Sequence, residues 1–414
     1  MIAASWLALV GVTLCACGNE VSMPSVEGAG GEESDPPVGD VDTTAPGDDD
    51  GPGPAGGDVA QGDDDPPGDA DLPPAKVPVF IAQGHAGRLL MSCDDGRSWR
   101  FDVSDDDAIV CFNPTDCDHS AMSAAGLTYA NGHFFASFGH GSSAGTLRHS
   151  VDGKTWTPLQ TGSSQGGVYF NGELLLWMEG HFGLSNDLGV TVDSNLENVP
   201  GHFYQSRTIA AQGDVIIVSG DGVGGLVSRD AGRTWQAATL VDVRWGRNVF
   251  MQTAPDGSLV TLSAVHDVQI GEQTYKTLAF AARSTDGGLT WVGSQRLDYV
   301  TAYVEWAGMF SDGGLLFAFF DNAMWTSEDG ITWGGVTVQT SLPAGRITDG
   351  AIARGPSGTY VTVTDVWNNY YDKQRAYRSD DGLHWTQLDA ESFTGGHPVR
   401  HMTTGWVDAA ACAE

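Results

Sequence analysis

The sequence predicts an all-β fold, a seven-bladed β-propeller, and three observations carry this prediction. The first is composition: the 414 residues include 56 glycines, about 14% of the chain, and 13 tryptophans. Glycine at roughly twice its average usage indicates many tight turns. The second observation is a short motif that recurs seven times, and the third is a glycine-centred hairpin between its copies. Short strands and turns at a regular spacing are typical of all-β repeat folds.

The repeated motif is S-x-D, followed by a glycine and, a few residues later, a tryptophan. Its aspartates recur on average about every 48 residues, which is the length of a four-stranded blade. The copies are SCDDGRSW (92–99), SVDGKTW (150–156), SNDLGVTV (185–192), SRDAGRTW (228–235), STDGGLTW (284–291), SEDGITW (327–333) and SDDGLHW (379–385).

The chemistry of the motif indicates a structural role. An aspartate in a tight turn accepts hydrogen bonds from nearby backbone amides, and the glycine permits the positive φ that such a turn needs. The tryptophan leaves the turn and packs between neighbouring sheets. The third copy ends in Val192 and three copies lack one residue, so those turns should be tighter or less regular. We expect the following residues to form turns and not to act as catalytic acids: Asp94, Asp152, Asp187, Asp230, Asp286, Asp329 and Asp381.

This motif resembles the Asp box, or BNR repeat, found in sialidases, sortilin-type receptors and photosystem-assembly-factor-like propellers. The resemblance covers residues 92–385 and rests on seven copies at a blade-sized spacing. It implies a propeller of the sialidase-like superfamily.

Hairpins between the copies supply the remaining strands. Each unit is predicted to run strand, turn, strand, loop, strand, Asp box, strand. Asn131-Gly132 and Asn171-Gly172 are strong hairpin turns. Because the first unit, from Val79, is one strand short, residues 397–409 are expected to add the innermost strand of blade one and close the ring. A six-bladed ring with one decayed motif is the alternative.

The N-terminal residues 1–17 are predicted to be a lipoprotein signal peptide. Residues 2–16 are apolar but too short to span a bilayer, and Leu14-Cys15-Ala16-Cys17 resembles the lipobox of bacterial lipoproteins. The resemblance implies lipidation at Cys17 and attachment to the cell envelope, at the outer membrane or the cell surface. A plain secretory signal is the alternative, and either one predicts export.

Residues 18–76 are predicted to be a disordered tether, followed by the propeller domain 77–414. The tether has 16 acidic residues and one lysine and almost no large apolar side chain, so it cannot form a core. Its Asp triplets lack the spacing of a calcium loop, so we expect no bound metal there.

Four cysteines remain after the signal, and an even number is expected of an exported protein. They are Cys93, Cys111, Cys117 and Cys412. Cys111 and Cys117 flank a five-residue loop, and Cys93 and Cys412 would then pair across the closure of the ring. Three connectivities are compatible with the sequence, and the closure argument favours this one.

The net charge of −33 argues against binding to nucleic acid or to an anionic membrane face, because the protein would repel phosphate. No catalytic-triad elbow, zinc-helix motif, P-loop or dinucleotide fingerprint is present, so we expect no cofactor. The chain is expected to be a monomer.

Candidate ligand-binding residues lie where loops should emerge opposite the Asp boxes. A ring of polar residues is predicted between the second and third strands of the blades: His85, His140, His181, Asp221, His266, Asp267, Asp321 and Asp365. A second set precedes the innermost strands: Arg207, Arg247, Tyr303, Glu305, Arg346 and Arg400. Aromatic residues that could line this face, or pack within the blades, are Trp245, Trp306, Trp367, Tyr370 and Tyr371.

Two functions fit these candidates. The first is a binding or scaffolding module for a glycan or protein ligand. The second is a glycoside hydrolase, because in sialidases arginines hold the substrate carboxylate and a tyrosine polarised by a glutamate is the nucleophile. The R-I-P motif of sialidases and a matching acid/base aspartate are absent here, which favours the binding module.

Overall fold

A computed structural model describes most of the chain from residue 75 onward. The described residues are 75–103, 124–139, 146–159, 167–178, 182–191, 208–219, 225–246, 249–300, 303–304, 306–320, 322–340, 351–363, 375–388 and 398–413. They belong to one compact unit, Asp69–Glu414. The predicted signal, almost all of the tether, and Cys15, Cys17, Cys111 and Cys117 lie outside them.

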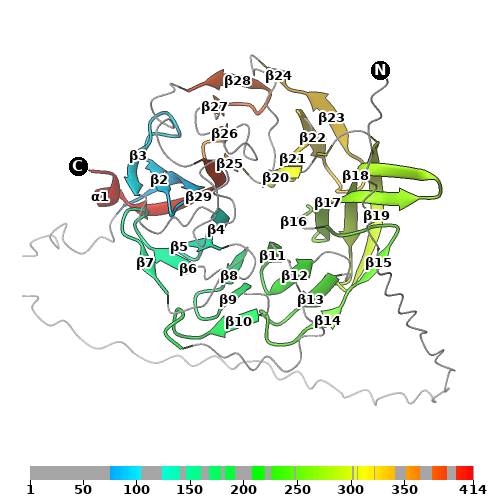
Figure 1. Cartoon of the computed structure of the whole chain (residues 1–414), viewed down its shortest axis with the longest axis horizontal. Coiled ribbons are helices and arrows are strands. Elements are labelled where there is room, and N and C mark those ends of the chain that lie inside the picture. Colours follow the sequence, from blue (N-terminus) through cyan, green and yellow to red (C-terminus); the bar gives the residue numbers. More distant parts are fainter. Residues whose placement is uncertain are drawn as a thin grey trace, which may run out of the picture. The chain divides into compact units, whose positions relative to one another are not determined.

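Seven sheets surround a central axis and form the blades of a propeller (Figure 1). This arrangement confirms the predicted fold class and excludes the six-bladed alternative. From the axis outward, blade 1 consists of β29 (Val399–Asp408), β1 (Lys76–Gly84), β2 (Leu89–Ser92) and β3 (Arg100–Val103). Blade 2 consists of β4 (Ala124–Ala130), β5 (His133–Phe138), β6 (Thr146–Ser150) and β7 (Thr157–Pro158). The strands described in blade 3 are β8 (Val168–Phe170), β9 (Leu175–Met178) and β10 (Phe182–Ser185).

The other four blades follow the same order. Blade 4 consists of β11 (Thr208–Gln212), β12 (Val215–Ser219), β13 (Gly225–Ser228) and β14 (Gln236–Ala237). Blade 5 consists of β16 (Val249–Thr253), β17 (Leu259–Ile270), β18 (Gln273–Ser284), β19 (Thr290–Tyr299) and β15 (Thr239–Val241). Blade 6 consists of β20 (Trp306–Asp312), β21 (Leu315–Phe320), β22 (Ala323–Ser327) and β23 (Gly334–Thr337). Blade 7 consists of β25 (Ile352–Arg354), β26 (Tyr360–Val363), β27 (Ala376–Ser379), β28 (His384–Gln387) and β24 (Gln339–Thr340).

Two blades exceed the four strands expected from the repeat. β15 and β24 each precede a blade in sequence and pair in parallel with its outermost strand, β19 and β28. A strand added from the connecting segment covers a sheet edge that would otherwise be open to pairing. The repeat alone does not reveal these strands because they lie between two motif-bearing units.

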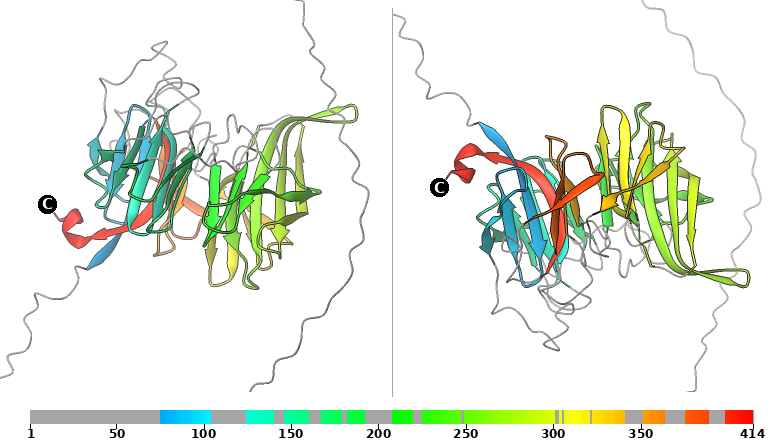
Figure 2. Two further views of the ribbon diagram at one scale, coloured as in Figure 1. Left: turned by 90° about the horizontal axis from the view of Figure 1, so that it is seen from below. Right: turned by 90° about the horizontal axis from the view of Figure 1, so that it is seen from above.

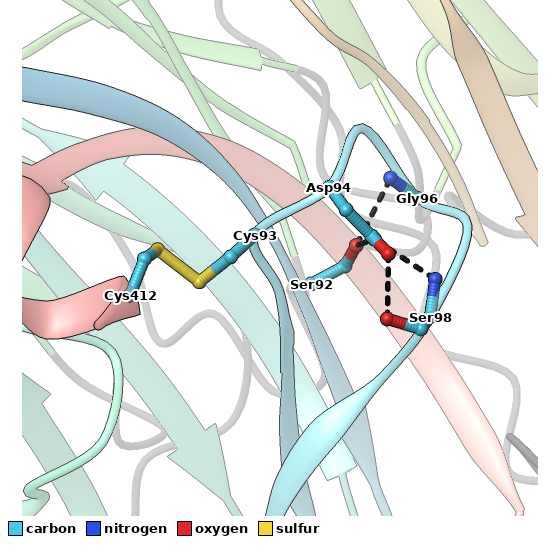
Figure 3. The surroundings of a disulfide bond; sticks show 6 residues. All are labelled: Ser92, Cys93, Asp94, Gly96, Ser98 and Cys412. Atoms are coloured by element: carbon cyan, nitrogen blue, oxygen red, sulfur yellow. Dashed lines mark hydrogen bonds between the residues drawn. A yellow bond between two sulfur atoms is a disulfide. The ribbon is translucent and has the colours of Figure 1, made fainter. Parts of the chain in front are cut away.

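The ring closes through its C-terminal strand, as the sequence predicts. β29 pairs antiparallel with β1 from Lys76↔Asp408 to Gly84↔Val399, so the last strand is the innermost strand of the first blade. β1 begins three residues before Val79. A short helix, α1 (Ala409–Cys412), follows β29, and a disulfide joins Cys412 to Cys93 at the end of β2 (Figure 3).

The hydrophobic core is divided among the seams between blades. The described residues form seven buried apolar clusters, each shared by two neighbouring blades. Trp291, for example, is fully buried with Ile217 and Val227 of blade 4. Burial of each large apolar side chain contributes about 1.5–3 kcal/mol. In the part of the chain that the structure describes, no helix is long and apolar enough to cross a membrane.

Polar side chains also join the ends of the innermost strands, or their adjoining turns, across all seven seams. Around the ring, these bridges are Tyr129 to the carbonyl of Trp406, Asn131 to that of Phe170, Tyr169 to that of Gly213, Gln212 to that of Met251, Gln252 to that of Met309, Arg354 to the Asp312 carboxylate, and Thr404 to the carbonyl of Arg354. The bridged ends are those nearest the S-x-D turns, since strand order puts the first and third turns of a blade on one face. We call the face that carries the S-x-D turns the box face. On this face, side-chain hydrogen bonds link each blade to the next around the axis.

Candidate functional site

The seven S-x-D turns share one hydrogen-bond pattern. The serine Oγ donates to the aspartate Oδ1 at 2.8–3.1 Å, and the glycine amide donates to the same serine Oγ at 2.7–2.9 Å. In five turns the tryptophan Nε1 donates to the glycine carbonyl. The three shorter turns are tighter, as expected, but make the same bonds: their glycine is three residues after the serine instead of four.

The glycine of each turn also lies against the preceding blade. A Cβ at Gly96 would be 2.4 Å from Val361 Cγ2 of blade 7, and one at Gly330 would be 2.2 Å from Val260 Cγ2 of blade 5. Both glycines have positive φ, at +81° and +68°. Glycine is required there for backbone conformation and for the close approach of two blades. Within the described residues, these turns hold the blades together.

The turn aspartates have lowered pKa values. Burial of the Asp286 carboxylate acts to raise its pKa, but the Thr290 amide and the Ser284 hydroxyl donate hydrogen bonds to it and together hold the pKa below its usual range. The same balance lowers the pKa of Asp94, Asp152, Asp230 and Asp381. At Asp187 and Asp329 the backbone amides of Thr191 and Thr332 are the leading cause. All seven carboxylates are therefore ionised at neutral pH and engaged within their own turns.

This pattern predicts acid sensitivity of the fold. A carboxylate whose pKa is lower in the folded than in the unfolded chain stabilises the fold fully above the unfolded pKa of about 3.9, and that contribution is lost as pH falls through the folded pKa. We expect the urea midpoint of unfolding to fall steeply below about pH 4. Asp286→Asn should lower the midpoint at pH 7 and flatten its decline in acid. Equal declines in wild type and variant would contradict this account.

The candidate ligand-binding residues were predicted to lie on the opposite face. Of the residues expected there, the structure describes His85, His266, Asp267, Tyr303 and Arg400, together with Trp245 and Trp306. The remaining candidates lie outside the described residues: His140, His181, Asp221, Asp321, Asp365, Arg207, Arg247, Glu305, Arg346, Trp367, Tyr370 and Tyr371. Arg400 is the one arginine of the second candidate set that lies among the described residues.

His85 and Arg400 form a buried pair in blade 1. Arg400 lies within β29, not before it, and its Nε is 2.9 Å from His85 Nε2, while the amide of Ala124 is 3.0 Å from His85 Nδ1. Arg400 and His85 are 5% and 4% exposed. Since a neutral imidazole has one acceptor nitrogen, only one of these contacts is a full hydrogen bond. Both ring nitrogens face protein donors, so His85 is not available as a metal ligand or general base.

A second polar cluster lies on blade 5, where the structure corrects a sequence prediction. His266 and Asp267 were expected in the loop after the second strand, but they lie within β17. β17 and β18 form a long hairpin whose turn is at Gly271-Glu272, and it projects beyond the other strands (Figure 2). Asp267 has φ +50° and lies opposite Lys276, between the paired residues His266↔Thr277 and Val268↔Tyr275. Residues directly opposite each other on antiparallel strands are close enough for their side chains to interact.

Asp267, Lys276 and Tyr303 contact one another. Lys276 Nζ donates to Asp267 Oδ1 at 2.6 Å and to Tyr303 Oη at 2.8 Å, and Tyr303 Oη donates to the Asp267 carboxylate at 2.9 Å. Hydrogen bonds from Lys276 and Tyr303 lower the pKa of Asp267, and the bond to Asp267 raises that of Lys276. Tyr303 is half exposed. The sequence analysis identified Tyr303 as a candidate but not Lys276. The only feature that points to Lys276 is its position opposite Asp267 in the β17–β18 hairpin.

The remaining described candidates are packing residues. Trp245 is 5% exposed and lies edge-on to Trp291, and Trp306 is 3% exposed and donates to the Ser263 carbonyl. These two tryptophans lie inside the seams and not on the face. No group of three or more His, Cys, Asp or Glu side chains able to hold a metal occurs among the residues that the structure describes.

Comparison with known proteins supports the fold class defined above, a β-propeller. No protein-family model matches the chain, and no curated protein matches it. Solved structures do. A family-GH74 xyloglucanase from Xanthomonas campestris is 15% identical, with a TM-score of 0.50 over 74% of this chain and 52% of that one. A protein from Lactobacillus plantarum is 12% identical, with a TM-score of 0.50 over 80% and 100%.

A structure of YCF48 bound to D1 peptide is also similar, at 17% identity, over 69% of this chain and 93% of that chain, with a TM-score of 0.44. At these identities the likeness concerns the fold alone.

Proposed function

We propose that this chain is an exported, lipid-anchored β-propeller of the Asp-box type that binds a glycan or protein ligand on the face opposite its box turns. The main support is how its polar groups are distributed between the two faces. On the box face, the Ser and Asp side chains of all seven turns are engaged within their own turns. On the opposite face, Asp267, Lys276 and Tyr303 form an exposed cluster of donors and acceptors.

The anchoring part of the proposal rests on the sequence. Cys17 follows a lipobox-like Leu14-Cys15-Ala16, and 58 residues rich in acidic side chains and proline separate it from the first strand. Such a chain stays extended by charge repulsion and would hold the propeller away from the envelope. A Cys17→Ser variant should leave the membrane fraction and lack a lipid mass. If that variant remains membrane-bound and the wild type carries no lipid, the anchoring proposal fails.

The binding part can be tested with the purified full chain on glycan and peptide arrays. Lys276→Ala should weaken any binding detected there, because it removes the ammonium that holds the cluster together. A matched control is Lys76→Ala, since Lys76 also pairs with one aspartate, Asp408, but at the start of β1. Loss of binding in both variants, or in neither, would contradict a site at Asp267, Lys276 and Tyr303.

A second candidate, glycoside hydrolase activity, is favoured by one observation. The Tyr303 hydroxyl donates to the carboxylate of Asp267, and a carboxylate partner is the arrangement that activates a tyrosine nucleophile. Sialidase and glucanase assays on the full chain test it. Product release that disappears in Tyr303→Phe would establish the hydrolase, and its absence leaves the binding module.

A further inference from the structure

Two histidines face each other on blade 2, away from the candidate ligand-binding cluster. His133 is the first residue of β5 and His149 the fourth of β6. Their Nδ1 and Nε2 atoms are 2.6 Å apart, and the ring centroids are 4.8 Å apart at an interplanar angle of 26°. Both side chains are half-buried. The two imidazole nitrogens are thus within hydrogen-bond distance of each other, and both side chains are partly exposed to solvent.

The surroundings of the pair are apolar. Phe170 of blade 3 packs edge-on against His133 at 5.0 Å, and Phe135 lies 5.3 Å from His149. Leu188, from the S-x-D turn of blade 3, packs in the same cluster. Burial lowers the pKa of both histidines, and at His149 the charge of His133 adds to the effect. Both rings are therefore neutral at pH 7, the form that binds metal ions.

The sevenfold repeat provides an internal control for this position. In each blade, two residues occupy the equivalent position. One directly precedes the motif serine, and the other directly precedes the residue that pairs with this serine on the neighbouring strand. The equivalent pairs are Val79/Met91, Leu174/Leu184, Val215/Val227, Ser258/Arg283, Leu315/Thr326 and Thr359/Arg378.

Three of these pairs are wholly apolar, and in blades 5 and 7 the arginine donates a hydrogen bond to its partner. The fold therefore does not require histidine at this position. Blade 2 alone of the seven has two imidazoles there.

We propose that His133 and His149 form a two-imidazole binding site for a borderline divalent cation such as Zn²⁺. Zinc–nitrogen bonds of about 2.0–2.1 Å in tetrahedral geometry separate two ligand nitrogens by about 3.3 Å, so the rings need to move apart by about 0.7 Å. The ion would take the place of the direct contact between the two nitrogens. Water completes the coordination, since the described residues provide no third protein ligand. Such a site binds less tightly than a closed structural zinc site.

The test is zinc titration of the full chain, at about 1–100 µM ZnCl₂ and pH 7.5, by calorimetry and by competition with a chromophoric chelator. The key variant changes both residues, His133→Leu with His149→Leu, which reproduces the Leu174/Leu184 pair of blade 3. It should fold with an unfolding midpoint at or above that of the wild type and take up one zinc ion fewer per chain. Each single leucine variant should bind that ion at least about tenfold more weakly.

His384→Gln is the control, since His384 is exposed and already bonded to Asp381. It should bind zinc as the wild type does. If the leucine pair does not fold, His133→Gln provides the same comparison with a polar side chain retained. The proposal is wrong if the wild type takes up no zinc in this range, or if folded His133 and His149 variants keep the wild-type stoichiometry and affinity.

Discussion

A chain that ends at Ser392 is expected not to fold, because it lacks β29, the innermost strand of blade 1. β29 buries Val399, Met402 and Val407 completely or almost so, which corresponds to about 5–9 kcal/mol of apolar burial. Its loss also removes the whole ladder to β1 and leaves a sheet edge open next to the central axis. Folded domains of this kind are stable by only about 5–15 kcal/mol in total.

The measurement is cooperative urea unfolding followed by near-ultraviolet circular dichroism. Deletion of residues 18–75 is the control and should leave the unfolding midpoint almost unchanged, although it removes many more residues. A point variant gives an independent reading: a Cβ at Gly405 would lie 2.4–2.6 Å from the rings of Tyr129 and Phe134, so Gly405→Val should also be strongly destabilising. A truncated chain with a wild-type unfolding transition would overturn the closure model.

Loss of the Cys93–Cys412 disulfide is expected to have the second-largest effect. The bridge joins residues 319 positions apart, and in the chain-entropy model a loop of this size stabilises the fold by about 6 kcal/mol, less any strain. Cys93 lies inside the first S-x-D turn, between Ser92 and Asp94, and Cys412 lies in α1 directly after β29 (Figure 3). The bridge therefore holds the closing strand where it leaves the ring. Cys93→Ser should lower the unfolding midpoint in urea and reduce hydrogen-exchange protection in β1 and β29 first.

A double-mutant cycle separates the bridge from the packing of each sulfur. If the two cysteines act as one bridge, Cys93→Ser, Cys412→Ser and the double variant should be destabilised by nearly equal amounts. Additive effects would mean that each sulfur contributes through its own contacts. Non-reducing peptide mapping should also recover Cys93 linked to Cys412. A link from Cys93 to Cys111 or Cys117 would show that the Cys93–Cys412 pairing is wrong.

The S-x-D turns show why part of this structure can be predicted from sequence. Each turn is local: Ser284, Asp286 and Gly288 satisfy one another within five residues, so the pattern is the same wherever it occurs. Seven such turns at a regular spacing predicted seven blades, and the missing strand of blade 1 predicted closure by the C-terminus. Both predictions are confirmed by the sheet order.

The polar clusters show where sequence reasoning stops. Lys276 contacts Asp267 because the two residues lie opposite each other in the β17–β18 hairpin, and no local motif encodes that pairing. His133 and His149 are sixteen residues apart and meet only because β5 and β6 pair with Phe134 opposite Ser150. A sequence scan for metal ligands at helical or loop spacing passes over such a pair.

The sequence by itself therefore determined the architecture: the blade number, the turn chemistry and the way the ring closes follow from local motifs and from the count of strands. The tertiary structure alone decided which side chains meet across strands and seams. It placed Tyr303 against Asp267, buried Arg400 against His85, and added β15 and β24 to two outer edges. The physical reason is that local hydrogen bonding is encoded in consecutive residues, whereas contacts between distant residues depend on register and on the close packing of neighbouring blades.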